Sequence, residues 1–150
     1  AVTIVFPGGD YDTLRPTSRA NVIDFNGRTG YVRTALRAGV PIVPMVSIGG
    51  QEGQIHLSRG EWIAKHLPTR NLIRSDYFPI SLGFPFGLTP AIPVNLPLPT
   101  KIVSQVLEPI DIEAEFGPDP DIAEVDRVVR ERMQEALTQL ARERRFPVLG

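Results

Sequence analysis

The chain contains no cysteine among its 150 residues and has only two histidines. Without cysteine it has no disulfide framework, no thiolate nucleophile and no cysteine metal site. Two histidines offer little for any other metal centre. We therefore expect no metal and no protein-bound cofactor, and the composition is compatible with a reducing cytoplasm.

The chain also lacks an excess of charge of either sign. Its 16 basic and 17 acidic residues give a formal net charge of -1. Such a balance creates no overall field that would attract nucleic acid or an anionic membrane. We expect no nucleic-acid partner, and any electrostatic attraction to a membrane must be local.

A long hydrophobic run suited to a membrane span is missing as well. A transmembrane helix needs about 20 apolar residues, and the one long uncharged stretch, from Tyr77 to Pro99, contains six prolines. This stretch cannot form one regular element. Its aromatic and aliphatic side chains either pack in a core, which we favour, or meet lipid. In the second case Arg70 and Arg74 would anchor to anionic headgroups.

The first half of the chain predicts a strand, a helix and a second strand. Residues 2–6 are a β-branched and aromatic run that ends at a glycine pair, and 40–47 are rich in valine and isoleucine. Between them, 10–27 read as a long surface loop, and 29–38 place apolar residues on one helical face before Gly39. This order predicts a parallel crossover unit.

Three further elements are expected in the second half. Residues 61–67 favour a short helix and 102–107 a strand. The segment 121–144 repeats apolar residues every three or four positions, with an acidic start and a basic end, and predicts a long amphipathic helix. With 42% hydrophobic residues and this length, one domain suffices.

The pair Gly8-Gly9 follows the first predicted strand. Glycine lets a backbone approach a ligand closely and exposes amide groups, which suits phosphate or another anion. A tight turn explains the pair equally well. Neither the P-loop pattern nor the dinucleotide pattern occurs in the chain.

An ordered set of motifs then narrows the choice. It resembles the later motif blocks of the phospholipid and glycerol acyltransferase superfamily, in the lysophospholipid and diacylglycerol acyltransferase-like branch. The blocks are Val5-Phe6-Pro7-Gly8-Gly9, then Phe25 to Val32 leading into Ala35 to Gly39, then Val40-Pro41-Ile42-Val43-Pro44 with Gly49, then Pro79 to Pro90 and Lys101 to Ile110.

The resemblance implies part of the glycerol-3-phosphate acyltransferase fold. This is an α/β fold with a mixed, largely parallel sheet, flanking helices and a long C-terminal amphipathic helix. Residues 1–150 would be the carboxyl-terminal half of one acyltransferase domain. Such enzymes move a fatty acyl group from acyl-CoA to a hydroxyl of a glycerolipid. Their H-x-x-x-x-D motif precedes the first block, so we expect the catalytic half upstream and no catalytic residue here.

The resemblance and the nearby arginines together give a predicted substrate-binding set. Much of the family has a glutamate where this chain has Gly8, which favours a neutral or atypical acceptor. Arginine binds phosphate or CoA in a bidentate fork, although solvated surface arginine is the alternative for both arginines of the set. The set is Phe6, Pro7, Gly8, Gly9, Arg15, Arg28, Gly30, Val43 and Pro44.

One other pattern imitates the catalytic motif. His56 precedes Glu61 by five residues, which gives H-x-x-x-x-E. The pattern follows the last block instead of preceding the first, and glutamate reaches differently from aspartate, so we expect no catalytic role. We interpret His56 and His66 as partly exposed surface residues.

The leading hypothesis is a peripheral acyltransferase at the cytoplasmic face of a membrane, with acyl-CoA and a glycerolipid as substrates. The alternatives are a non-catalytic lipid- or acyl-binding module on the same scaffold and an unrelated phosphate-binding α/β domain. A half sheet leaves an open edge, so we expect the missing half or another chain to cover it.

Overall fold

The structure is a computed structural model that describes residues 2–66, 77–90 and 94–144. The chain folds into two compact units, each assembled from segments far apart in the sequence. The first contains the described residues of Ala1–Gly9, Asn21–Ile48 and Val103–Glu143. The second contains those of Asp10–Ala20, Gly49–Ile102 and Arg144–Gly150. Each unit has its own antiparallel sheet.

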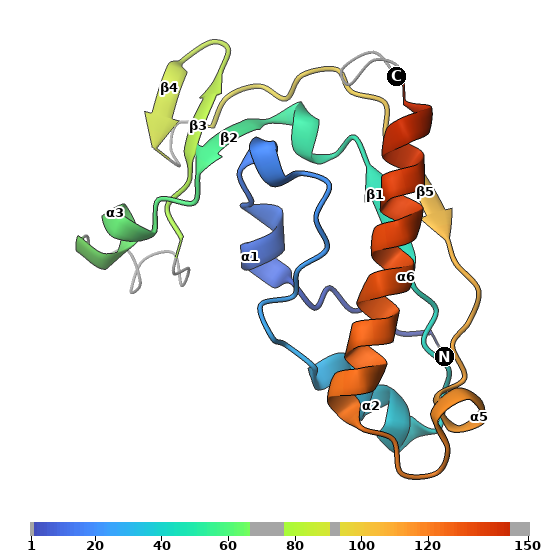
Figure 1. Ribbon diagram of the computed structural model, residues 1–150. Helices are drawn as coiled ribbons and strands as arrows, with labels where there is room; N and C mark the ends of the chain where they lie inside the picture. The colour runs from blue at the N-terminus through green and yellow to red at the C-terminus, as the bar shows by residue number, and fades with distance from the viewer. Residues whose placement is uncertain (1, 67–76, 91–93, 145–150) are drawn as a thin grey trace. The chain divides into compact units, whose positions relative to one another are not determined.

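The first unit is built on a two-stranded sheet covered by a long helix. Strand β1 (Met45–Ile48) pairs antiparallel with β5 (Val103–Val106), and helix α6 (Ile122–Glu143) lies along them (Figure 1). Burial alternates along β1, so Val46 and Ile48 face the core while Met45 and Ser47 face out. The two inward residues pack with Ala136 and Leu137 of α6.

Two shorter helices complete the first unit. Helix α2 (Gly30–Ala38) ends at Gly39, whose φ of 60° is left-handed and whose N–H reaches the carbonyls of the last turn. Helix α5 (Ile112–Phe116) is capped by Asp111, which accepts a hydrogen bond from the Ala114 amide (3.1 Å). Their apolar side chains form a second core cluster with α6, made of Val32, Ala35, Ile110, Ile112, Val125 and Val129.

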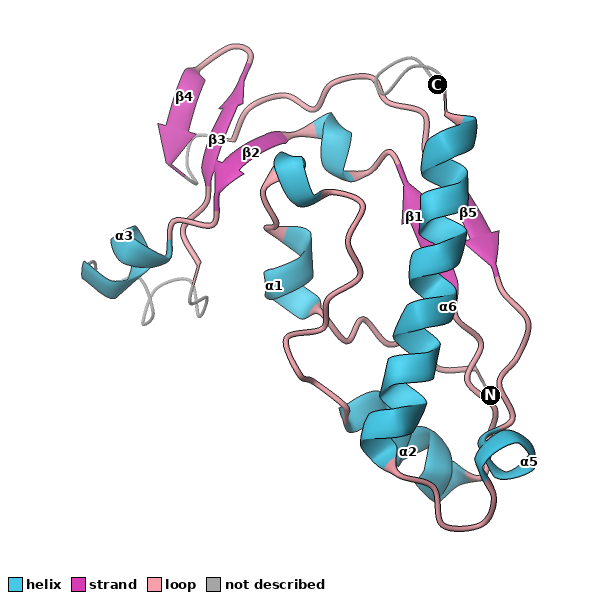
Figure 2. Ribbon diagram, in the orientation of Figure 1, coloured by secondary structure: helices cyan, strands magenta, loops and turns pink. Residues whose placement is uncertain are grey.

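The second unit contains the sheet β2 (Ile55–Ser58), β3 (Ile80–Gly83) and β4 (Gly87–Pro90), in that order (Figure 2). Helix α3 (Glu61–His66) follows β2. Helix α1 (Gly9–Thr13) and the 3-10 helices η1 (Thr17–Arg19) and η2 (Gln51–Gly53) are short. The side chain of Asn95 holds the β3–β4 hairpin, because it binds the Phe86 N–H (3.1 Å) and the Gly87 carbonyl (2.9 Å).

The predicted largely parallel sheet is wrong. Both described sheets are antiparallel, and β1 pairs with β5 rather than with residues 2–6. The segment 2–6 belongs to no described strand, and its side chains Val2 and Phe6 are exposed. In the second predicted strand, Pro41 and Pro44 have no N–H to donate, so 40–44 contribute only the bridge from Ile42 to Ile110.

The three predicted helices are confirmed, and one predicted loop is not. Helices α2, α3 and α6 and strand β5 lie where the sequence predicts them. The expected loop over 10–27 instead contains most of α1 and all of η1. The buried face of α6 is not purely apolar, because the charged Asp126 is buried beside Val125. The amphipathic character of this helix therefore stays a prediction.

The uncharged stretch does not pack as a core in the described residues. It splits into β3 and β4, as its prolines require, but the hairpin side chains are exposed: Phe84 by 74%, Phe86 by 54% and Leu88 by 63%. The favoured core interpretation is therefore wrong for the hairpin. Arg70 and Arg74, the expected headgroup anchors, lie outside the described residues. Within the described chain, no helix has the length and hydropathy needed to cross a bilayer.

Candidate functional site

The glycine pair forms a tight turn in the first unit. The Gly9 N–H donates to the carbonyl of Phe6 (3.2 Å), and Gly9 has a φ of 50° that side chains rarely adopt. Gly8 is buried, whereas the Phe6 ring is 77% exposed. The turn therefore presents an aromatic ring to solvent beside a closely packed backbone.

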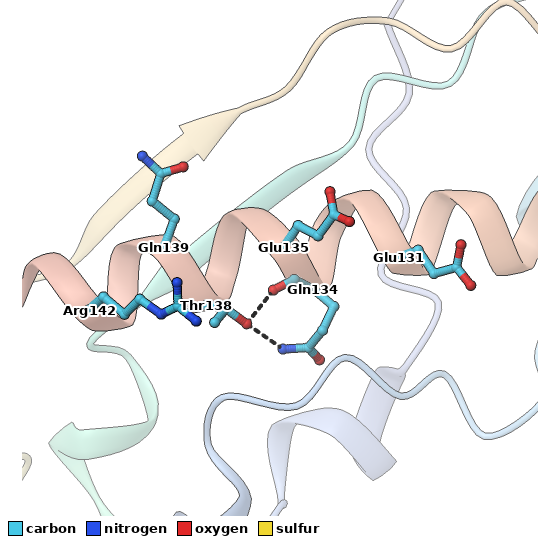
Figure 3. A pocket seen from close by; sticks show the side chains of 6 residues that line it. All are labelled: Glu131, Gln134, Glu135, Thr138, Gln139 and Arg142. Atoms are coloured by element: carbon cyan, nitrogen blue, oxygen red, sulfur yellow. Dashed lines mark hydrogen bonds between the residues drawn. The ribbon is translucent and has the colours of Figure 1, made fainter.

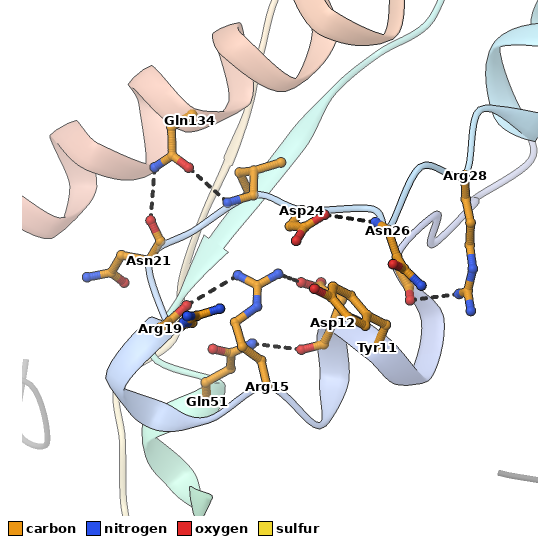
Figure 4. A network of polar contacts seen from close by, with 12 residues as sticks. Tyr11, Asp12, Arg15, Arg19, Asn21, Asp24, Asn26, Arg28, Gln51 and Gln134 are labelled. Atoms are coloured by element: carbon orange, nitrogen blue, oxygen red, sulfur yellow. Dashed lines mark hydrogen bonds and ion pairs between the residues drawn. The ribbon is translucent and has the colours of Figure 1, made fainter. Parts of the chain in front are cut away.

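A second turn lies opposite the first. The Arg28 N–H donates to the Phe25 carbonyl (3.1 Å), and the two residues between them, Asn26 and Gly27, have left-handed φ values of 54° and 70°. Asp24 accepts a hydrogen bond from the Asn26 amide (2.8 Å), which supports the turn (Figure 4). Arg28 therefore stands at the last position of this turn.

Arg28 joins the two turns. Its Nη1 donates to the Gly8 carbonyl at 2.8 Å (Figure 4), and a Cβ added at Gly9 would lie 2.8 Å from the same nitrogen. The bond uses one of the five donors of a guanidinium on an exposed residue. We call this pair of turns the Gly8–Arg28 site. Its exposed cation is suited to an anionic ligand.

A buried polar contact fixes α2, which begins just after Arg28. The Tyr31 hydroxyl donates to Asp126 Oδ1 on α6 (2.8 Å), and Arg130 Nε donates to Oδ2 of the same carboxylate (2.8 Å). Burial, the hydrogen bond and the charge of Asp126 raise the pKa of the Tyr31 hydroxyl, against a smaller lowering effect of Arg130. The Tyr31 ring also meets Phe25 edge to face at 5.7 Å.

The other predicted site residues have different surroundings. Arg15, in the second unit, is 3% exposed; its guanidinium pairs with Asp12 and binds the Arg19 carbonyl (Figure 4). Gly30 opens α2 and accepts from the Thr34 hydroxyl (2.9 Å). Val43 is half exposed. Pro44 is buried and accepts from the Leu107 N–H (2.9 Å).

The structure thus brings Gly8 and Gly9 into contact with Arg28, and places Arg15 in the other unit. Substrate contact by any member of the predicted set stays a prediction. Both Gly8 and Arg28 could be singled out from the sequence. They are 20 positions apart, however, and nothing in that spacing indicated that they are in contact.

His56 is a buried residue, and the surface interpretation of it is wrong. It lies on the inward face of β2, is 8% exposed, and its Nδ1 lies 3.0 Å from the Ser81 hydroxyl on β3. Burial lowers the pKa of its imidazole. Glu61, which completes the imitation of the catalytic motif, is exposed in the first turn of α3. His66 is exposed, as expected.

Sequence reasoning missed an open groove of about 580 Å³ in the second unit. It is lined by residues from η1 and its flanks, from the segment that joins β2 to α3, and from β3. We call it the Trp62 groove. Its arginines, Arg19 and Arg59, are 40 positions apart in the sequence and form no motif, so no sequence signal could have found it.

A second hollow, of about 510 Å³, runs along α6. All of its lining side chains come from this one helix (Figure 3). Gln134 and Thr138 bind each other there (3.3 Å), and Gln134 also fixes the chain at Asn21 and Ile23. Because one helix face cannot enclose a ligand, we do not take this hollow as a site. Among the described residues, no cluster of histidine and carboxylate side chains could hold a metal ion.

The fold is a mixed α/β arrangement with two small antiparallel sheets, and the Gly8–Arg28 site lies in its first unit. In a comparison with protein families, residues 1–145 match the diacylglycerol acyltransferase family, and the chain belongs to it.

Three curated relatives, one uncharacterized protein of Mycobacterium bovis and two of Mycobacterium tuberculosis, are each 37% identical over 156 aligned positions. The alignments cover 99% of this chain and 40% of each relative, so the chain spans about two fifths of their length. No solved structure matches the chain.

Proposed function

We propose that this chain is the carboxyl-terminal half of an acyltransferase domain that transfers a fatty acyl group from acyl-CoA to a hydroxyl of a glycerolipid. Membership of the diacylglycerol acyltransferase family over residues 1–145 carries the proposal. The chain would supply blocks that bind donor and acceptor, with the Gly8–Arg28 site among them. The same membership argues against the unrelated phosphate-binding domain.

In the proposed reaction the acceptor hydroxyl oxygen attacks the thioester carbonyl carbon. The new C–O bond forms as the C–S bond breaks, and the hydroxyl proton passes through a general base to the departing CoA sulfur. The base would be the histidine of an H-x-x-x-x-D motif outside this chain. Within the chain, His56 is followed five positions later by Glu61 and His66 by Asn71.

The Gly8–Arg28 site would contact the polar part of a substrate. With glycine at position 8 the turn has no carboxylate, and the guanidinium of Arg28 is the charged group that binds the Gly8 carbonyl. This arrangement supports either a phosphate on Arg28 or a neutral acceptor that accepts hydrogen bonds from it.

We also propose peripheral contact with a membrane at its cytoplasmic face through the β3–β4 hairpin. Phe84, Phe86 and Leu88 are exposed there, and no residue from Tyr77 to Thr100 is charged. Aromatic rings on a hairpin held by Asn95 can enter the headgroup region without unfolding.

Flotation with phosphatidylcholine–phosphatidylglycerol vesicles tests the membrane contact. The double variant Phe84→Ser and Phe86→Ser should lose most of the bound fraction, because both rings leave the interface. Val22→Ser removes a side chain that is 44% exposed in the first unit and serves as the matched control. Equal flotation of all three proteins would rule out the hairpin as the contact.

A non-catalytic lipid- or acyl-binding module on the same scaffold remains the alternative. Release of the CoA thiol by the intact protein, with lysophospholipid and acylglycerol acceptors, separates the two. We expect transfer that disappears when the upstream histidine is changed and persists in His56→Ala. Acyl-CoA binding without thiol release would support the module.

The role of the Gly8–Arg28 site is tested in the same assay. Arg28→Gln should raise the KM for the substrate that Arg28 contacts about tenfold, because this factor corresponds to the loss of one charge-assisted hydrogen bond. Arg33→Gln, which removes an exposed arginine of α2, should leave KM unchanged. Identical kinetics of the two variants would exclude Arg28 from substrate binding.

The exposed side of the β1–β5 sheet carries apolar side chains that a binding partner of the first unit would cover. Met45 and Val106 lie opposite each other in the register and are 49% and 64% exposed. We propose that the upstream half of the domain, or another chain, covers this apolar surface and the neighbouring open edges.

A further inference from the structure

The Trp62 groove contains two arginines and one acidic residue. Arg59 is held in place: its guanidinium carbon lies 3.8 Å from the centroid of the Tyr11 ring, and its Nε donates to the Tyr11 carbonyl (3.2 Å). The Tyr11 contacts thus fix the guanidinium of a residue that lines the groove, and use its Nε donor. Arg19 lines the groove from η1, and Glu61 lines it from α3. The lining is therefore net positive and complements an anion.

The same groove has an aromatic wall. Trp62, in the first turn of α3, is 71% exposed and Leu57 on β2 is 52% exposed. The indole meets the His66 ring at 4.8 Å, which positions it while most of its surface stays accessible. A flat, exposed indole next to guanidinium groups can stack with a planar base.

We propose that the Trp62 groove binds the adenine nucleotide part of CoA, with phosphates on Arg19 and Arg59 and the adenine on Trp62. The inference rests on the proposed function and names the site of its thioester donor. The volume of about 580 Å³ lies within the roughly 300–1,000 Å³ of small-molecule sites.

The alternatives fit this lining less well. A fatty acyl chain or a neutral glyceride would cover Trp62 and Leu57 but leave both guanidinium groups without an anionic partner. A lysophospholipid brings a single phosphate and no planar ring. CoA brings three phosphate groups and a purine, which together match the two arginines and the indole.

The chain itself provides the probe, because Trp62 is its one tryptophan. Titration of the chain with free CoA should quench the tryptophan fluorescence in a saturable way, and calorimetry should give the same Kd. Arg19→Gln and Arg59→Gln should each weaken CoA binding about ten- to a hundredfold, the value of a charge-assisted hydrogen bond. Arg19 is exposed, so its replacement should leave the fold intact.

Three further variants serve as controls for the change in the Kd for CoA. Glu61→Gln should tighten CoA binding, because it removes the one carboxylate of the lining. Arg33→Gln, in the other unit, should leave Kd unchanged. Arg59→Lys retains the charge but loses the fork and the Tyr11 contact, so its Kd should lie between those of the original chain and Arg59→Gln.

Three results would overturn the assignment. They are the absence of CoA binding, CoA binding that both arginine variants leave unchanged, and tighter binding of lysophosphatidic acid than of CoA. Kinetics of the intact protein keep this inference separate from the proposed function. Acyl transfer with an unchanged KM for acyl-CoA in Arg19→Gln refutes the groove alone. CoA binding in the groove of a protein that transfers no acyl group refutes the proposed function alone.

Discussion

Replacing Asp126 with alanine should destabilise the chain by about 2–4 kcal/mol. The carboxylate is 7% exposed and accepts two hydrogen bonds of 2.8 Å, from the Tyr31 hydroxyl and from Arg130 Nε. A hydrogen bond to a charged group contributes about 1.5–3 kcal/mol. Because Arg130 is 39% exposed, solvent screening reduces its part to about 0.5–1 kcal/mol. The Tyr31 bond should therefore account for most of the effect.

Single replacements of the two partners separate these contributions. Tyr31→Phe keeps the ring against Phe25 and removes only the hydroxyl, so it should cost about 1.5–3 kcal/mol. Arg130→Gln removes the more exposed partner and should cost less than about 1 kcal/mol. Urea unfolding followed by circular dichroism measures all three free energies. A larger loss for Arg130→Gln than for Tyr31→Phe would refute the reasoning.

The raised pKa of Tyr31 adds a pH test. The folded chain keeps the phenolic proton at a pH where the unfolded chain, with a tyrosine pKa of about 10, loses it. The stabilisation is therefore fully present below about pH 10 and declines as the pH rises above that value. The free energy of unfolding of Tyr31→Phe should fall less steeply between pH 9 and 11 than that of the original chain. Parallel curves would show that the hydroxyl titrates normally.

Three further perturbations follow from the described contacts. Gly9→Ala should lower stability more than Gly27→Ala. Both positions have positive φ, but only at Gly9 would the added Cβ meet Arg28, at 2.8 Å. Gly9→Val should lower stability further, and thermal unfolding measures this order. The lowered pKa of His56 means that its neutral form stabilises the fold above about pH 6.5 and that stability falls as the pH drops below it. His56→Gln should flatten this acid limb of the stability curve, and an unchanged slope would contradict it. Val129→Ala, at a side chain that is 1% exposed, should cost about 2 kcal/mol in urea unfolding. Val22→Ala at an exposed position should cost almost nothing.

Local sequence signals predicted the helices because each helix depends mainly on nearby residues. The spacing of apolar residues over 121–144 gave α6 almost to its ends, and Gly39 marked the end of α2 through its left-handed φ. The strand at 103–106 was equally readable from its β-branched residues. In each case, the determining contacts lie within a few positions of the chain.

Strand pairing was not predictable because it joins distant segments. Met45 pairs with Val106, which lies 61 positions further along the chain, and nothing local distinguishes this partner from residues 2–6. Strand β2 was missed because Ile55 to Ser58 is short and contains a polar residue, His56, on its buried face. The burial of that histidine depends on Ser81, which the sequence places 25 positions away.

At the Gly8–Arg28 site the glycine pair allowed two readings, a ligand close to the backbone or a tight turn. The structure has the tight turn and places the guanidinium of Arg28 against it, while contact with a ligand stays a prediction. A side chain at position 9 would displace that guanidinium before it touched any substrate. The glycines therefore determine the position of Arg28, and a ligand would be affected by them through the hydrogen-bond donors of Arg28. Under the proposed function, the P-G-G turn would need no carboxylate of its own, because Arg28 on the facing turn supplies the charge.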